Sequence, residues 1–223
     1  DLDEKWDALV ESSPDTSLFM LSGYLRNVAC RLGLYRCYNA RELRAVVALV
    51  ESADGESAIM DDLVIYGGVC FGAPTNAQGI AQQNSERHEL NTYLASALAQ
   101  RYRSVEFALT PSIRDVRAFQ WYRYGEETGR YQAEVRYTSC IDISDFASAS
   151  CLEDIGAYRQ ATGARRQQIR YARRDGIVTE EFDDAALFID FYRMTMARHG
   201  EIVEIGKLAR MERLVSNLCR SGM

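Results

Sequence analysis

A pair of strand-like segments separated by a short polar turn constrains the fold of this chain more than any other feature. Residues 34–39 and 43–52 have strand character, and residues 40–41 form the turn between them. Two such segments predict an antiparallel hairpin. A further strand follows at 61–73, and a helical pattern runs from about residue 80 to 101. The sequence therefore predicts an α/β chain of the α+β kind, with a mixed, mainly antiparallel sheet flanked by helices.

Other helices and strands are predicted on both sides of this region. Helical patterns cover residues 2–11 and about 16–32, and Gly33 is the stop signal of the second. Towards the C-terminus, the pattern predicts strands at 104–109 and 131–143, helices opened by Pro111 and by Asp183-Asp184, and a last helix at 207–220.

Composition and charge disfavour several functional classes. The 223 residues carry a formal net charge of −6 and have a pI near 5.1, which argues against DNA binding, because such binding needs a basic surface that displaces counterions. No apolar run approaches the roughly 20 residues that cross a bilayer, so no transmembrane segment is predicted. The six cysteines are scattered without a CxxC pair, so neither a metal site nor a disulfide framework is predicted. These features are typical of a reduced, cytoplasmic protein.

An arginine-rich segment between residues 158 and 183 departs from this acidic composition. The segment has the pattern of a helix that Thr162 caps and Asp175-Gly176 ends, because glycine accepts the left-handed conformation that follows a helix. A short strand is predicted at residues 177–179. At about 100° per residue, one stripe of this helix is apolar and the adjacent one is basic.

The basic stripe is predicted to bind phosphate. Guanidinium groups present five donors in a planar fork and need a carboxylate or a ligand to satisfy them. An alternative interpretation is a solvated face whose methylene stems cover apolar surface. The apolar stripe comprises Tyr158, Ile169 and Ala172, with Arg165 near it, and the residues predicted to contact phosphate are Arg165, Arg166, Arg170 and Arg173.

A second anion site is predicted where the strand at 61–73 leads into the helix at 80–101. A strand, a glycine-containing loop and a helix N-terminus can receive a pyrophosphate, because the amides of the first helical turn point outward. Gly72 and Gly79 are the candidate cofactor-binding residues. The spacing matches neither a P-loop nor GxGxxG. For Gly67-Gly68 within the strand, a bulge or a close backbone approach is the favoured interpretation.

Four aromatic residues gather just before Gly125. Stacked aromatic rings can bind a nucleobase or a sugar, but they are more often used to pack a core, and the sequence favours core packing here. The residues are Phe119, Trp121, Tyr122 and Tyr124.

Several runs of this sequence resemble the FemABX family, whose proteins contain two GNAT-like acyltransferase domains. The runs RYTSCIDIS, ARRQQIRYARRDGIVTEE and FIDFYRMTMARHG are similar to the second domain of that family. WDALVESSPDTSLFMLSGYL and DDLVIYGGVCFG are similar to the opening and the central strand of the first. The resemblance implies a first GNAT-like domain at 1–140 and an incomplete second one at 141–223.

The resemblance also implies an activity. FemABX proteins transfer an amino acid from aminoacyl-tRNA to a peptidoglycan precursor, and related double-GNAT proteins act in cell-surface polysaccharide pathways. An acyl or aminoacyl transferase is therefore expected, with acyl-CoA or aminoacyl-tRNA as co-substrate. The expected partners are a nucleotide-linked or polysaccharide precursor and tRNA, and the oligomeric state is left open.

Two departures from the family pattern are expected to matter. The chain is expected to lack strands of the family fold at both ends. The acyl-CoA signature Q/R-x-x-G-x-G/A is also incomplete, because the run from Gln160 to Arg165 ends in arginine where a small residue should stand. This departure disfavours ordinary acetyl-CoA use.

The catalytic base is left open among several residues. An amine that attacks an ester or thioester must lose a proton, and donors must hold the developing oxyanion. His199 is a candidate because histidine is the side chain whose unperturbed pKa lies near neutrality, and Asp142 and Glu201 are equally defensible. For both His88 and His199, an exposed structural histidine is the favoured interpretation.

The second hypothesis is a catalytically silent GNAT-like module that docks a protein partner. An apolar face on the last predicted helix would form the docking surface. Its residues are Leu208, Met211, Leu214 and Leu218.

Overall fold

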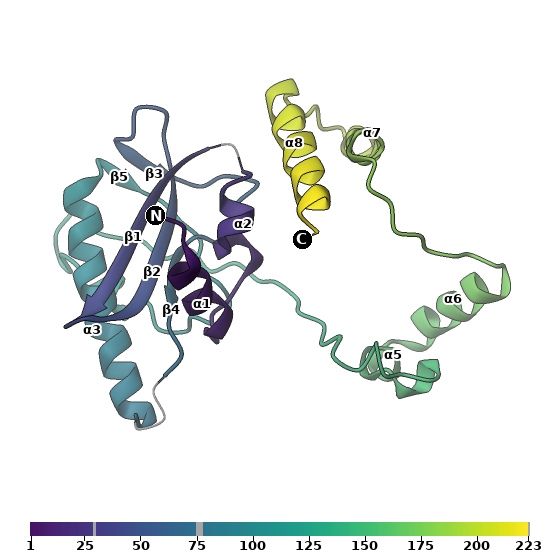
Figure 1. Ribbon diagram of the computed structural model, residues 1–223, viewed down its shortest axis with the longest axis horizontal. Coiled ribbons are helices and arrows are strands. Elements are labelled where there is room, and N and C mark those ends of the chain that lie inside the picture. Colours follow the sequence, from purple (N-terminus) through teal and green to yellow (C-terminus); the bar gives the residue numbers. More distant parts are fainter. Residues whose placement is uncertain (29, 75–77, 223) are drawn as a thin grey trace. The chain divides into compact units, whose positions relative to one another are not determined.

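The computed structural model describes residues 1–28, 30–74 and 78–222, and the chain forms two compact units (Figure 1). The first unit comprises residues 1–134 and 183–223, and the second comprises residues 135–182. The fold is α+β, with a mostly antiparallel sheet and flanking helices, as predicted. The division into compact units does not test the predicted GNAT-like domains 1–140 and 141–223, which stay a prediction.

β1 (Arg31–Asn39) and β2 (Glu42–Glu51) form the predicted antiparallel hairpin. The turn residue Ala40 has a φ of 53°, in the left-handed region that tight hairpin turns use. From Arg44 onward every residue of β2 is buried. β2 is therefore covered on both faces and forms the centre of the first unit.

Two short strands share the edge of β2 that lies opposite β1. β3 (Ser57–Ile59) pairs antiparallel with the end of β2, and β4 (Gly68–Phe71) pairs antiparallel with its middle. β1 pairs along the whole of one edge of β2. On the other edge, β3 and β4 follow one another and amount to one strand interrupted by residues 60–67. β5 (Ser104–Val105) pairs parallel with β3.

The predicted strand at 61–73 is correct only from Gly68 to Phe71. Gly68 has a φ of 76°, and a β-carbon there would stand 2.8 Å from Cδ2 of Phe107. A β-carbon at Gly67 would stand 3.0 Å from the carbonyl oxygen of Ala48, so the predicted close backbone approach is found at Gly67. The predicted strand at 104–109 is likewise shortened to β5.

Helices cover both faces of the sheet (Figure 1). On one face, α1 (Glu4–Ser12), the 3₁₀-helix η1 (Leu18–Met20) and α2 (Ser22–Leu25) pack through Trp6, Val10, Met20 and Leu25 against Val46, Ala48 and Cys70. On the other face, α3 (Ile80–Arg101) packs through Leu94 and Leu98 against Val47, Leu49, Val69 and Phe71. Alternate residues of β2 thus face opposite helical layers, as the two-residue period of a strand dictates.

The prediction of one long helix at 16–32 is wrong. η1 and α2 replace it, and β1 has already begun at Arg31. Gly33 does not end a helix; it lies in β1 opposite Leu49. Pairing with β2 satisfies the backbone of this segment and packs Leu32 and Leu34 against the α1 layer, which outweighs the helical spacing of the sequence.

The second unit consists of short helices and extended chain. η2 (Leu152–Asp154), α5 (Gly156–Gln160) and α6 (Gly163–Arg174) are its helices. The strands predicted at 131–143 and 177–179 are absent, although all of these residues are described. Alternating side chains form a strand only beside a partner strand, and Tyr137 is instead 96% exposed.

The first unit also contains three helices that follow β5 in the sequence. α4 (Arg117–Trp121) is shorter than the helix predicted from Pro111. Asp184 caps α7 (Ala185–Arg198) by accepting the Leu187 amide, as predicted. α8 (Ile205–Ser221) contains the predicted last helix.

The apolar stripe of α8 is not an open docking face. Leu214 is buried among Tyr24, Val28 and Leu63, and Met211 and Leu218 pack against the same cluster. Leu208 is half-buried. Arg210 anchors the helix by donating to both carboxylate oxygens of Asp61, at 3.0 and 2.8 Å. The expectation of an exposed surface is therefore corrected.

Candidate functional site

The arginine helix α6 begins and ends as the sequence predicts, with Thr162 as its N-cap and Gly176 just after its last turn. Oγ1 of Thr162 accepts the amide of Arg165 at 3.3 Å and caps the first turn. At the other end, the amide of Gly176 bonds to the carbonyl of Arg173 and the amide of Ile177 bonds to that of Ala172. Gly176 has a φ of 70°, so the helix ends in a Schellman motif.

The arginines at 166, 170 and 173, here called the arginine stripe, are exposed on one side of α6. Ile169 and Ala172 are the α6 residues with less exposure, which agrees with the predicted apolar stripe. Within the ranges that the structure describes, no carboxylate pairs with any member of the arginine stripe. At 1.5 Å rise per residue, the stripe extends over roughly 10 Å of helix. Three free guanidinium groups can thus contact more than one phosphate.

The other arginines of this segment are engaged. Arg165 is exposed rather than close to the apolar stripe, and its Nη1 donates to Oε1 of Gln168 at 2.9 Å. Arg174 pairs with Asp175 at 2.9 Å and lies over the ring of Tyr171. The structure therefore separates Arg165 from the other three residues of the predicted phosphate site.

The junction between β4 and α3 has the predicted order of strand, glycine and helix N-terminus. Gly72 follows β4, and its amide donates to the carbonyl of Arg44 at 2.8 Å. Gly79 is the N-cap of α3, and a β-carbon there would touch nothing within 4 Å. Because Gly79 has no side chain, the amides of the first turn lack a side-chain cap.

A cavity of about 20 Å³ lies at this junction beside Gly72. Two arginines line it, and each is held by carboxylates. Arg44 donates to Glu86 at 2.7 Å and to Glu42 at 2.9 Å, while Arg87 lies 2.9 Å from the buried carboxylate of Asp15. Since the cavity has room for about one water molecule and the carboxylates outnumber the arginines, a pyrophosphate would lie outside it.

Arg44 and Glu86 form a bidentate ion pair at this junction. Both guanidinium Nε and Nη2 of Arg44 donate to the carboxylate, at 2.7 and 2.9 Å. The hydrogen bond from Arg44 holds the pKa of Glu86 below its usual value. This pair was not predicted from the sequence, although a charged residue inside the apolar run of β2 is an unusual feature that singles out Arg44.

The three candidate catalytic bases are divided between the two units. His199 is the exposed C-cap of α7, and Glu201 is exposed two residues later; both belong to the first unit. Asp142 is exposed in the second unit, where the backbone amide of Ser144 donates to it and lowers its pKa. A lowered pKa stabilises the carboxylate and makes it a weaker base.

No three His, Cys, Asp or Glu side chains in the described ranges are grouped to hold a metal ion. None of the helices that the structure describes is long and apolar enough to cross a bilayer. Comparison of the chain with family models, with curated proteins and with solved structures finds no match.

Proposed function

We propose that this protein is an acyl or aminoacyl transferase that acts on an amine or hydroxyl group of a cell-wall or cell-surface polysaccharide precursor. The observation that carries the proposal is the arginine stripe, whose three exposed guanidinium groups have no carboxylate partner among the residues described. Unpaired guanidinium groups bind phosphate through forked, charge-assisted hydrogen bonds. The stripe is therefore proposed to bind a phosphate-bearing substrate, either a nucleotide-linked acceptor or tRNA.

The fold of the first unit supports the transferase part of the proposal. Its order of helices, antiparallel hairpin, β4, glycine, α3 and β5 is the order expected of a GNAT-like domain. In the proposed reaction the acceptor nitrogen or oxygen forms a bond to the acyl carbon, the ester or thioester bond breaks, and the acceptor proton passes to a base. Positioning of the two substrates can supply much of the rate.

A transfer assay tests the proposal. Labelled acetyl-CoA and labelled aminoacyl-tRNA are each incubated with the protein and a nucleotide-linked muramyl peptide, and label in the peptide is measured. The stripe variant, Arg166→Gln/Arg170→Gln/Arg173→Gln, is compared with a control, Arg103→Gln/Arg174→Gln/Arg193→Gln. The control removes the same charge from exposed arginines that already pair with Glu56, Asp175 and Asp190.

The expected result is transfer from one donor, reduced at least tenfold in the stripe variant and little changed in the control. A tenfold loss corresponds to about 1.4 kcal/mol of transition-state stabilisation. If neither donor is used while the muramyl nucleotide still binds, the transferase proposal fails, and the arginine stripe then binds a phosphate-bearing ligand without catalysing transfer.

A further inference from the structure

Trp121 is a large aromatic residue that the first unit leaves in solvent. Its side chain is 57% exposed, whereas Phe119 of the same short helix is buried. Core packing, the favoured interpretation of this aromatic cluster, therefore applies to Phe119 and not to Trp121. An exposed indole beside organised polar groups is a feature of ligand sites, because the ring offers a flat apolar face.

Polar side chains from two helices surround the indole. The guanidinium carbon of Arg117 lies over the Trp121 ring, 5.6 Å from its centre, and the rings of His88 and Trp121 form a T-shaped pair with centroids 5.5 Å apart. Arg117 in turn forms a fork with Asp115, at 2.9 and 2.6 Å. These four residues, Trp121, Arg117, Asp115 and His88, are here called the Trp121 platform.

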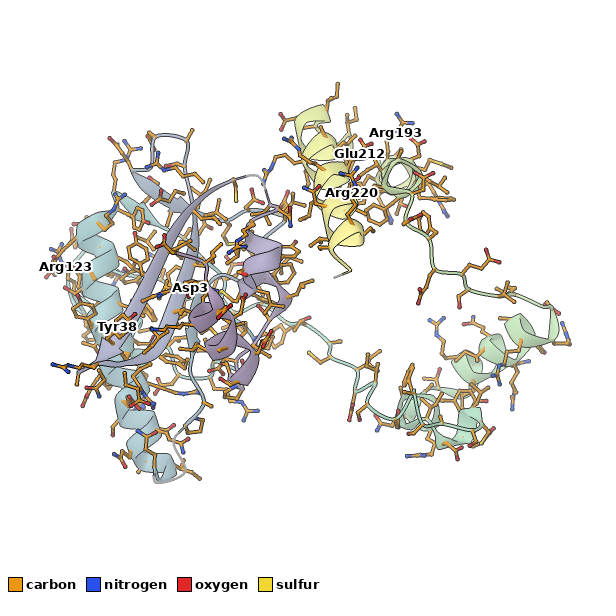
Figure 2. The ribbon with its side chains drawn as sticks, in the orientation of Figure 1. Asp3, Tyr38, Arg123, Arg193, Glu212 and Arg220 are labelled. Atoms are coloured by element: carbon orange, nitrogen blue, oxygen red, sulfur yellow. The ribbon has the colours of Figure 1, made fainter. Side chains whose placement is uncertain are left out.

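Core packing of Phe119 and a tight turn after Trp121 hold the Trp121 platform in place. The buried ring of Phe119 packs edge-on against Phe107 and Tyr131. After Trp121 the chain turns sharply, with the amide of Tyr124 bonded to the Trp121 carbonyl at 3.1 Å. Arg123 within this turn has a φ of 51°, which is uncommon for a residue other than glycine (Figure 2 labels this residue).

The charge around the Trp121 platform selects the kind of ligand. The segment from residue 114 to 127 contains three arginines and three carboxylates, so it has no net charge. A nucleotide would need an excess of positive charge for its phosphates. The positive residues are Arg114, Arg117 and Arg123, and the negative residues are Asp115, Glu126 and Glu127.

We propose that the Trp121 platform binds the pyranose ring of a neutral oligosaccharide. One apolar face of the sugar would stack on the indole of Trp121. Its ring hydroxyls would exchange hydrogen bonds with the planar guanidinium of Arg117 and the carboxylate of Asp115. This binding lies on the first unit alone and does not require the transfer reaction, so either proposal can fail without the other.

Tryptophan fluorescence can report this binding, because the two tryptophans of the chain lie in different environments. Trp6 is fully buried, and its Nε1 donates to the carbonyl of Met20 at 2.7 Å. Trp121 therefore supplies the solvent-sensitive part of the fluorescence. Titration of the intact chain with maltotetraose and with N-acetylated chitotetraose is expected to shift the emission to shorter wavelength with a saturable, millimolar dissociation constant.

Three variants decide the outcome, with affinity measured by calorimetry. Trp121→Ala is expected to weaken sugar binding at least tenfold, and Arg117→Gln, which keeps the ring, to weaken it several-fold. Tyr93→Ala removes another exposed aromatic residue, on α3, and is expected to bind as the unchanged chain does. Thermal unfolding checks that each variant is folded. Binding that survives in Trp121→Ala, no saturable binding of either sugar, or tighter binding of uridine monophosphate would overturn the proposal.

Discussion

The hydroxyl group of Tyr102, the C-cap of α3, lies so close to Gly33 of β1 that a β-carbon at Gly33 would clash with it. The same hydroxyl donates to Oε1 of the buried Glu51 at 2.7 Å and contacts the hydroxyl of Tyr35. Nε of Arg31 donates to the other carboxylate oxygen at 2.6 Å. A glycine in the middle of a strand is thus required by a polar network that joins the hairpin to α3.

Gly33→Ala is predicted to destabilise the first unit by about 1–3 kcal/mol, because the added methyl group must displace a hydroxyl that Glu51 holds in place. Urea denaturation followed by circular dichroism measures the change. Gly206→Ala in α8 is the control, since its β-carbon would meet only the flexible end of Glu204. Equal stability of Gly33→Ala and the unchanged chain would contradict the clash.

Tyr102→Phe alone is predicted to lower the free energy of unfolding by roughly 1–2 kcal/mol, because the buried Glu51 carboxylate loses a hydrogen-bond donor. Combined with Gly33→Ala, it should cost less than the sum of the two changes, since removing the hydroxyl makes room for the methyl group. A double-mutant cycle in urea measures this coupling. Additive losses would show that the two residues act independently.

The carboxyl group of Asp3 is predicted to titrate unusually low. A hydrogen bond from Arg36 lowers its pKa to about 2, and Asp3 also caps α1 by accepting the amide of Trp6 (Figure 2 labels Asp3). Because the folded pKa lies below the unfolded one, this contribution to stability is complete above about pH 4 and is lost as the pH falls towards 2.

Carboxyl carbon NMR tests this prediction by following the pKa of Asp3. Arg36→Gln should raise it towards its usual value. Arg117→Gln is the matched control, because it should raise the pKa of Asp115, which also lies at about 2, and leave Asp3 unchanged. A pKa of Asp3 that does not respond to Arg36→Gln would contradict the assigned cause.

The attachment of α8 is predicted to depend on Arg210. Arg210→Gln leaves the carboxylate of Asp61, which is 12% exposed, without its ionic partner. Removing one member of a largely buried ion pair lowers the stability of the folded state, because the other charge is left without a partner. Amide hydrogen exchange should therefore become faster throughout α8 and stay unchanged in α3. Arg213→Gln, at an exposed position of the same helix, should have little effect on exchange.

Features with local causes could be predicted from the sequence. The β1–β2 hairpin follows from two strand-like runs around a turn, and α3 has the predicted bounds of residues 80–101. The caps of α6 follow from Thr162 and Gly176, whose conformational preferences are properties of single residues.

Features that depend on distant partners could not be predicted in this way. η1, α2 and the first residues of β1 stand where one helix was expected at 16–32, and β1 begins at Arg31 because β2 pairs with it. The strand expected at 131–143 is absent because alternation does not supply a partner strand. Arg44 and Glu86 pair across 42 residues of sequence. The exposure of Trp121 likewise depends on how α4 packs, which spacing alone does not specify.

Calorimetric titration of a nucleotide-linked muramyl peptide tests the central proposal most directly. The unchanged chain and the Arg103/Arg174/Arg193 control are predicted to bind it with similar affinity, and the stripe variant is predicted to bind at least tenfold more weakly while its thermal unfolding is unchanged. The central proposal is contradicted if the stripe variant unfolds at a lower temperature but retains its affinity, because the arginine stripe would then serve the fold and not a phosphate-bearing ligand.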